Sequence, residues 1–146
     1  MHQTSNIKRK RNVEVSNQTL EEVRNFFAKD LYAKQSDFYI EAIDDHYAKI
    51  SCRLSDKHKN AVGGVMGGVY FTMADFTMAV ASNWQEPGTV SLDASISFLG
   101  VPKSDTLISE SELVKDGRST CCYLIHIMDD EGHHVAEAKF TGFHKR

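Results

Sequence analysis

Hydrophobic and polar residues divide the chain into one long apolar segment and several shorter segments with a regular pattern. The apolar segment runs from Val65 to Asn83, and its only charged side chain is Asp75. It is too long for an ordinary strand, and it lacks the strict alternation that leaves one face of a strand in water. We therefore predict a buried helix here, which opens with the glycines Gly67 and Gly68.

The segments around this helix predict a mainly antiparallel sheet. A covering helix is expected ahead of it, from about Ser16 to Lys34. Its apolar positions at helical spacing are Leu20, Val23, Phe26, Phe27 and Leu31. Strands are expected over residues 37–44, 46–54, 89–99, 106–115, 118–129 and 134–143. This order predicts an α+β fold in which the sheet wraps around the apolar helix.

The strand at residues 89–99 has the clearest alternation in the chain. One expected face is hydrophobic and carries Val90, Leu92, Ala94, Ile96 and Phe98. The other expected face is polar and carries Ser91, Asp93, Ser95 and Ser97. Such alternation is typical of a strand with one face against the core.

Asp75 is the residue in this pattern with the clearest chemical meaning. It follows Gly67 by eight residues, a little over two helical turns, so both lie on one side of the helix. The other residues expected on that face are Gly68, Phe71, Thr72, Met78, Ala79 and Ser82. Desolvation among small and apolar neighbours would raise the pKa of the carboxyl unless a partner pairs with it, and raised carboxyls often serve as general bases. The glycine-rich helix start leaves N–H groups bare, which favours an oxyanion.

Two other interpretations of this segment stay open on the sequence. The first is a transmembrane span, which the central carboxylate and the glycine-rich start both disfavour. The second is a buried Asp75 that only caps or bonds a neighbouring element.

Composition narrows the function classes. A chain of 146 residues is expected to form one domain at residues 16–146, behind a basic tail at residues 1–15. The net charge of −3 gives no general attraction to nucleic acid or to a membrane. The three cysteines fit neither a disulfide framework nor a zinc site, and the seven histidines are scattered, so no metal is indicated.

The tail at residues 1–15 contains the basic run Lys8–Arg11, which is a solvated tail or an interaction arm. No apolar signal-peptide region follows this run, so the cytoplasm is the expected location.

Four motifs carry a resemblance to a known family. They are N-x-x-G-x-x-M-G-G-x-x-x-x-x-A-D at residues 60–75, V-S-L-D at 90–93, D-G-R at 116–118 and D-E-G-x-x-V-A-E-A at 130–138. In these motifs, and in its order of elements from about Ser36 to Phe143, the chain resembles the hotdog-fold acyl-CoA thioesterases. The resemblance is strongest to the PaaI-like subgroup of the 4-hydroxybenzoyl-CoA thioesterase superfamily. It implies the hotdog fold, an antiparallel sheet wrapped around one long central helix.

The resemblance also implies roles for particular residues. Asp75 would be the general base or nucleophile, and the Gly67 N–H would bind the thioester carbonyl. Asn60 would help to bind substrate or place water, and Ser91 would help to hold the water. The subgroup commonly has His directly before the two glycines, where this chain has Met66. A thioether cannot donate a hydrogen bond, so that contribution is missing.

The remaining expectations concern coenzyme A and assembly. Met66 and Gly68 are expected at the substrate site. Lys103 and Arg118 are candidate contacts for the coenzyme A phosphates, with a solvated turn residue as the alternative for each. The nearest histidine in sequence is His58, and no pattern shows that it reaches the site. The resemblance implies a homodimer or homotetramer with sites at the subunit interface, and no cofactor beyond the coenzyme A of the substrate.

The leading functional hypothesis is hydrolysis of an acyl-CoA thioester to free acid and coenzyme A. The alternative, motivated by Met66, is a non-catalytic acyl-CoA-binding protein. A hotdog dehydratase is the third possibility, and the H-x-F-P-G motif of those enzymes does not occur here.

Overall fold

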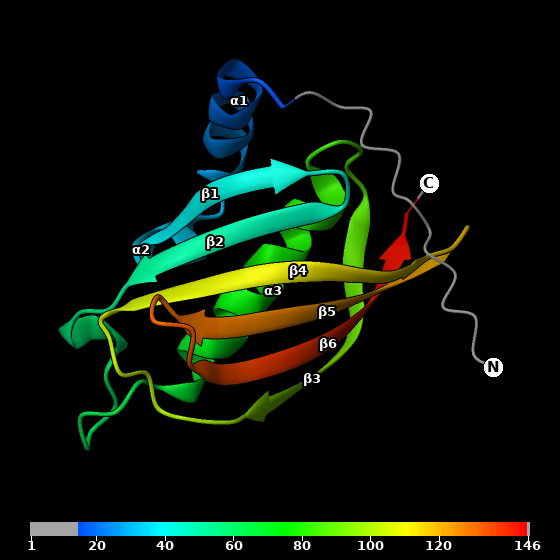
Figure 1. Cartoon of the computed structure of the whole chain (residues 1–146). Coiled ribbons are helices and arrows are strands. Elements are labelled where there is room, and N and C mark those ends of the chain that lie inside the picture. The colour runs from blue at the N-terminus through cyan, green and yellow to red at the C-terminus, as the bar shows by residue number, and fades with distance from the viewer. Residues whose placement is uncertain (1–14, 146) are drawn as a thin grey trace.

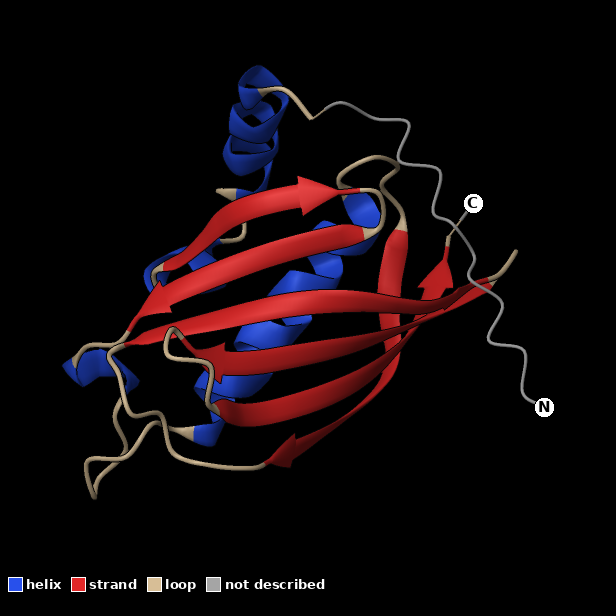
Figure 2. Cartoon of the chain, viewed as in Figure 1, coloured by secondary structure: helices blue, strands red, loops and turns tan. Residues whose placement is uncertain are grey.

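A six-stranded antiparallel sheet curves around the helix α3 (Gly67–Asn83) in the computed structural model, which describes residues 15–145 (Figure 1). The sheet order is β1 (Phe38–Asp44), β2 (Tyr47–Arg53), β4 (Thr106–Asp116), β5 (Thr120–Asp129), β6 (His134–His144) and β3 (Thr89–Phe98). Figure 2 shows that α3 lies against one face of this sheet. The predicted α+β hotdog fold is therefore confirmed. The basic run Lys8–Arg11 lies outside the described residues.

The helix α3 provides the centre of the hydrophobic core. Its buried side chains are Tyr70, Met73, Ala74, Phe76, Thr77, Met78, Val80 and Ala81. One stripe of the helix is exposed, however, and it includes Gly68, Phe71 and Asp75. The prediction of a wholly buried helix is wrong for this stripe, because no element among residues 15–145 covers it. Within the described residues, no helix is long and apolar enough to cross a membrane.

The N-terminal covering segment is two helices, not the one helix expected from Ser16 to Lys34. Ser16 caps α1 (Asn17–Phe27) by accepting the Thr19 N–H at 3.1 Å. The chain then turns before α2 (Leu31–Gln35), and the exposed Leu31 no longer continues the apolar stripe of α1. The break lets α1 bury Val23 and Phe27, while α2 buries Ala33.

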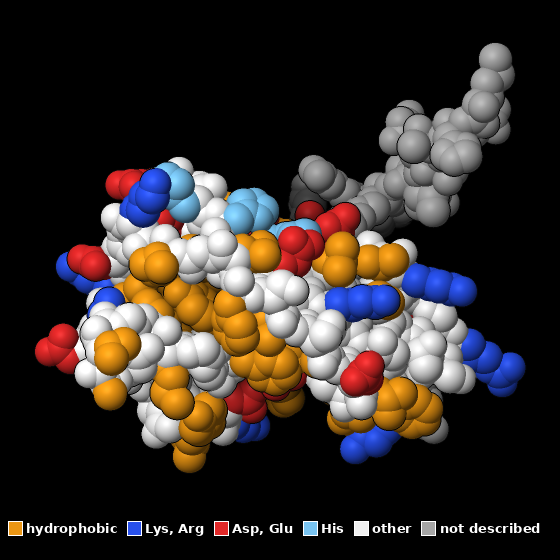
Figure 3. Space-filling model, turned by 90° about the horizontal axis from the view of Figure 1, so that it is seen from below, with side chains coloured by type: hydrophobic (Ala, Val, Ile, Leu, Met, Phe, Trp, Pro, Cys, Tyr) orange, Lys and Arg blue, Asp and Glu red, His pale blue; other side chains and the backbone are white. Residues whose placement is uncertain are grey.

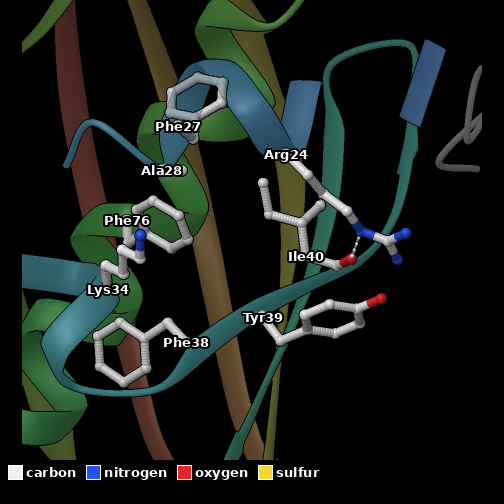
Figure 4. Close-up of a pocket in the computed structure, with 8 residues that line it drawn as sticks. All are labelled: Arg24, Phe27, Ala28, Lys34, Phe38, Tyr39, Ile40 and Phe76. Atoms are coloured by element: carbon white, nitrogen blue, oxygen red, sulfur yellow. Dashed lines mark hydrogen bonds between the residues drawn. The ribbon is translucent and has the colours of Figure 1, made fainter. Parts of the chain in front are cut away.

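Aromatic packing attaches α1 and β1 to one side of α3. The Phe27 ring meets the Phe76 ring edge to face at 6.1 Å, and Phe38 stacks on Phe76 at 6.2 Å. Figure 4 shows these rings around a cavity of about 170 Å³, beside Arg24. The Arg24 Nε–H donates to the Ile40 carbonyl at 2.8 Å, which fixes α1 on β1. α1 and β1 therefore pack on the Phe76 side of α3, whereas Asp75 is exposed.

A β-bulge in β3 changes the expected alternation. The pairing register with β6 shifts between Ser91 and Asp93, so Leu92 is an extra residue. Downstream of the bulge, Ala94 and Ile96 pack on the core. Upstream of the bulge, the Ser91 hydroxyl contacts α3 and so lies on the same side of the strand as Ala94. An uninterrupted alternation had predicted that Ser91 and Ala94 lie on opposite faces. The bulge therefore brings a polar residue to the helix side of the strand.

Gly142 in β6 allows the sheet to approach α3 closely. A Cβ at this position would lie 2.6 Å from the Cys121 Sγ and 2.6 Å from the Met78 Cε. Met78 is itself 1% exposed, so its methyl group has little room to move.

Replacement of Gly142 by Ala should destabilise the fold by about 1–3 kcal/mol, because the new methyl group overpacks the core. Urea unfolding followed by circular dichroism measures this change. Gly68→Ala is the matched control, since a Cβ there meets nothing within 4 Å. Equal stability of the Gly142→Ala protein and the wild type would show that the close packing at this point is not a constraint.

Candidate active site at the start of the central helix

The loop that leads into α3 is shaped by Asn60. Its Oδ1 accepts the N–H groups of Val62 at 3.1 Å and Gly64 at 3.0 Å. The main chain of Asn60 closes the same turn through Gly63 and Gly64. The structure thus gives Asn60 a role in the loop, and its predicted role toward substrate or water stays a prediction.

The first turn of α3 presents free backbone donors. The Val69 N–H bonds to the Met66 carbonyl at 3.0 Å, but within the described part of the chain the N–H groups of Gly67 and Gly68 have no acceptor. The Met66 side chain makes no capping bond. Bare N–H groups and the positive end of the helix macrodipole together suit an anionic oxygen.

Phe98 is an unpredicted neighbour of this turn. Its ring carbons lie 3.3 Å from the position that a Cβ on Gly67 would take, and the ring also packs near Tyr70. The sequence placed Phe98 on the hydrophobic face of its strand, but it carried no signal that this face ends beside the helix start.

Two of the predicted site residues are in direct contact. The Ser91 Oγ donates a hydrogen bond to the Asp75 Oδ1 at 3.0 Å, and it also lies 3.7 Å from the Met78 Sδ. Asp75 is exposed, which corrects the expectation that apolar neighbours on its face desolvate it. Its neighbours Gly68 and Phe71 are exposed too, so within one chain this face is open to water.

Asp30 is a second carboxylate on this side of the molecule that the sequence did not identify. Burial raises the pKa of Asp30, and the negative charge of Asp75 raises it further. Asp30 lies in the break between α1 and α2. Because the pattern predicted one continuous helix there, it gave no reason to place this residue near Asp75.

Asp75 and Gly67 are well separated within one chain. Eight residues of α-helix span about 12 Å along the axis. A general base and an oxyanion donor must both lie within about 3 Å of the reacting groups. The two residues share a side of the helix, as predicted, but one chain cannot bring both to the same carbonyl.

A cavity of about 360 Å³ lies beside the start of α3. It is lined by Tyr32, Gln35, Ser36, Lys57, His58, Met66, Gly68, Val69 and Thr72. The structure thus brings the predicted binding residues Met66 and Gly68 to one cavity. Tyr32 and Lys57 add a ring and an amine that the sequence analysis did not include.

The candidate phosphate contacts Lys103 and Arg118 are not brought together. Lys103 precedes β4 and Arg118 follows it, and eleven residues of strand span about 35 Å. Both side chains are exposed. In one chain they cannot bind the same phosphate group.

The backbone at Lys103 is held by Asp129, at the end of β5. The Asp129 carboxylate accepts hydrogen bonds from the N–H groups of Lys103, Glu131 and His133 and from the His133 ring. Burial alone raises the pKa of Asp129, but these hydrogen bonds outweigh burial and lower it to about 2, from an ordinary value of 3.8.

Three potential metal ligands meet at this turn, although the sequence indicated no metal. Ligand atoms of Asp129, Glu131 and His133 lie within 4.8 Å of one another. The Asp129 oxygens are already occupied by hydrogen bonds within the hairpin. Their evident role is to fix the turn, and the expectation of no metal stays a prediction.

Comparison with known proteins identifies the family. The sequence model of the thioesterase superfamily matches residues 62–136, which is about half of the chain and includes the start of α3, Asp75 and Ser91. The chain therefore belongs to the thioesterase superfamily.

Similar structures and a similar sequence agree with this assignment. The E. coli PaaI protein from the phenylacetic acid degradation operon has the same fold, with a TM-score of 0.82 and 22% identity over 91% of this chain and 97% of that one. A hypothetical thioesterase from Streptococcus pneumoniae, solved with coenzyme A, has a TM-score of 0.74 and 29% identity over 80% of this chain and 95% of that one. A protein of Archaeoglobus fulgidus named "Putative esterase" is 28% identical over 85% of this chain and 82% of its own length.

The charge of Asp129 should make stability depend on pH below 4. Its pKa is lower in the folded chain than in the unfolded chain, so its contribution is complete above about pH 4 and is lost as the pH falls toward 2. Asp129→Asn should therefore flatten the dependence of unfolding free energy on pH in this window. Urea titrations at several pH values measure it, and an unchanged dependence in the variant would contradict the assignment.

Proposed function

We propose that this protein hydrolyses an acyl-CoA thioester to a free acid and coenzyme A. Membership of the thioesterase superfamily supports hydrolase activity, and the similar Streptococcus pneumoniae protein was solved with coenzyme A. The observation that carries the proposal is the hydrogen bond from Ser91 of β3 to Asp75, which lies on the open stripe of α3. The first turn of the same helix presents free N–H groups.

The chemistry requires one base and one oxyanion site. Asp75 takes a proton from water, and the water oxygen attacks the thioester carbonyl. The Gly67 N–H holds the resulting oxyanion. The carbon–sulfur bond then breaks, and coenzyme A leaves as a thiolate that the transferred proton neutralises. Ser91 occupies Oδ1 of Asp75 and so leaves Oδ2 for the water. Direct attack by the carboxylate of Asp75 is the other route that this arrangement permits.

A site shared between two copies of the chain resolves the separation of about 12 Å between Asp75 and Gly67. If two α3 helices pack antiparallel along their open stripes, Asp75 of one copy faces the Gly67 N–H of the other. The edge strand β3 offers a surface for this pairing, and its exposed hydrophobic residues include Val90, Leu92 and Phe98. Figure 3 shows hydrophobic side chains gathered on this side of the molecule. These features support a homodimer, or a tetramer built from dimers.

The same assembly bears on coenzyme A binding. Lys103 and Arg118 lie at opposite ends of β4, so in a shared site they would come from different copies, or only one of them would contact phosphate. Coenzyme A enters as part of the substrate, and the proposal requires no other cofactor. A cytoplasmic location accords with such a substrate.

Met66 favours one alternative, a protein that binds acyl-CoA without hydrolysing it. The thioether next to the glycines is 58% exposed at the cavity and cannot donate a hydrogen bond to a thioester. The two functions differ in one observable, the release of free thiol.

Two substitutions should separate the base from the oxyanion donor. Asp75→Asn should abolish thiol release from acyl-CoA and preserve the fold, because it removes the proton acceptor. Gly67→Pro removes the N–H at the first helical position, where proline is tolerated, and should lower the rate by about 10²–10³-fold. Gly67→Ala keeps the N–H and is the matched control.

The assay follows free thiol with a chromogenic disulfide reagent across aromatic, short-chain and long-chain acyl-CoAs. Thiol release by the wild type that survives in Asp75→Asn would refute the role of Asp75. Binding of acyl-CoA by the wild type without any release would favour the non-catalytic alternative.

A further inference from the structure

His58 lies where three segments meet: the 3-10 helix after β2, the end of α2 and the residues that lead into α3. It ends η1 (Asp56–His58), a short 3-10 helix after β2, and its side chain is 2% exposed. Its ring contacts Ser55, the N-cap of η1, and Ser36, the C-cap of α2. A histidine buried this deeply needs partners for both ring nitrogens.

The partners of the ring fix its protonation. The Nδ1 lies 3.0 Å from the Ser55 backbone nitrogen, which can only donate, so Nδ1 must be the acceptor. The Nε2 lies 2.8 Å from the Ser36 carbonyl oxygen, which can only accept, so Nε2 must carry the hydrogen. The ring is therefore the neutral Nε2–H tautomer. A second proton on Nδ1 would break the bond from the Ser55 N–H and leave the Ser55 Oγ, 3.3 Å away, as the acceptor on that side.

The nearby thiol of Cys52 does not change this conclusion. Its Sγ lies 3.5 Å from the His58 Nε2, a spacing at which a cysteine and a histidine can form a nucleophilic pair. Burial, and to a lesser extent the charge of Asp37, raise the pKa of Cys52 to about 11, although Lys57 acts in the opposite direction. The thiol therefore stays protonated near neutral pH, and the pair has no thiolate to attack a substrate or to stabilise an imidazolium.

The backbone of His58 connects this anchor to the helix start. Its carbonyl accepts the Met66 N–H at 2.9 Å, and Lys59 pairs with Val65 in a short antiparallel bridge. Met66 is the N-cap of α3, but its side chain makes no capping bond. This main-chain bond holds the N-cap residue Met66 in place, and the next N–H along the chain is that of Gly67.

We propose that His58 is a positioning residue for the oxyanion site. Its neutral ring fixes the segment whose carbonyl holds Met66, and this sets the direction of the Gly67 N–H. The inference rests on the proposed function, because it assigns a purpose to the Gly67 donor. His58 does not touch the substrate in this role, and it acts through Met66 and Gly67.

Kinetics provides the first test, on the acyl-CoA that the wild type hydrolyses fastest. His58→Phe keeps a ring and loses both bonds, and it should lower kcat by about 10- to 100-fold with KM changed less than about twofold, as a misdirected donor does. His58→Gln can still donate to the Ser36 carbonyl and should recover part of the loss. Ser111→Ala is the control, since it removes another buried hydrogen bond, to the Ala48 N–H, away from the helix start.

The rates are compared per folded molecule, with the folded fraction measured by circular dichroism. Wild-type kcat in folded His58→Phe would overturn the proposal. An equal loss of kcat in Ser111→Ala would also overturn it, because the effect would then be a general loss of stability.

Nuclear magnetic resonance provides a second test that does not need turnover. In the wild type, ¹⁵N shifts should identify a protonated Nε2 and an unprotonated Nδ1 on His58 at neutral pH. In His58→Gln, the amide resonance of Gly67 should shift, whereas Ser111→Ala should leave it in place. The opposite tautomer, or an unmoved Gly67 amide, would overturn the positioning role. A wild type that releases no thiol would refute the proposed function alone, and these spectra would still decide the role of His58.

Discussion

The apolar helix α3 is the constraint on which the rest of the structure depends. Apolar side chains surround it on nearly every side, so it needs cover in every direction. The sheet covers one face, and the aromatic contacts of Phe76 with Phe27 and Phe38 secure α1 and the start of β1 on another. The remaining stripe carries Asp75 and is open in a single chain. The uncovered stripe and the candidate base are therefore the same surface, which links assembly to catalysis.

Local departures from regular structure fit the sheet to this helix. The bulge after Ser91 brings one hydroxyl to Asp75, while Ala94 and Ile96 beyond it pack against the hydrophobic core. The missing side chain of Gly142 lets Met78 press into β6. At the start of the helix, the Met66 N–H is held by a main-chain carbonyl, and in the described part of the chain no side chain caps the N–H groups of Gly67 and Gly68. The bulge and the helix start both direct polar groups toward the proposed chemistry, whereas Gly142 allows close packing.

Much of the fold could be predicted from the sequence. Every expected strand is present within a few residues of its predicted ends, because the period of two and the turn residues are local signals. The break at residues 28–30 was missed because the helical spacing of Leu31 continued the pattern of α1, whereas in the structure α2 buries Ala33 and leaves Leu31 exposed. The bulge at Leu92 was missed for a similar reason, since alternation carries no mark of an inserted residue.

The candidate site was predictable only in part. The glycines and the lone carboxylate on an apolar helix identified Gly67 and Asp75, and the resemblance added Ser91, which does contact Asp75. The exposure of Asp75 was not predictable, because it depends on what one chain leaves uncovered. Asp30 and Phe98 were missed because their proximity to the site arises from tertiary packing. His58 was noticed only as a neighbour in sequence, and its role depends on contacts with Ser36 and Ser55 that no spacing reveals.

The most direct test of the central claim is subunit complementation between two inactive variants. Asp75→Asn and Gly67→Pro, carrying different affinity tags, are coexpressed, and the mixed assemblies are purified through both tags. If each site takes Asp75 from one copy and Gly67 from the other, every mixed dimer has one intact site and should show about half of wild-type thiol release. Mixed dimers no more active than the two separate variants would contradict a shared site and would place the whole reaction within one chain.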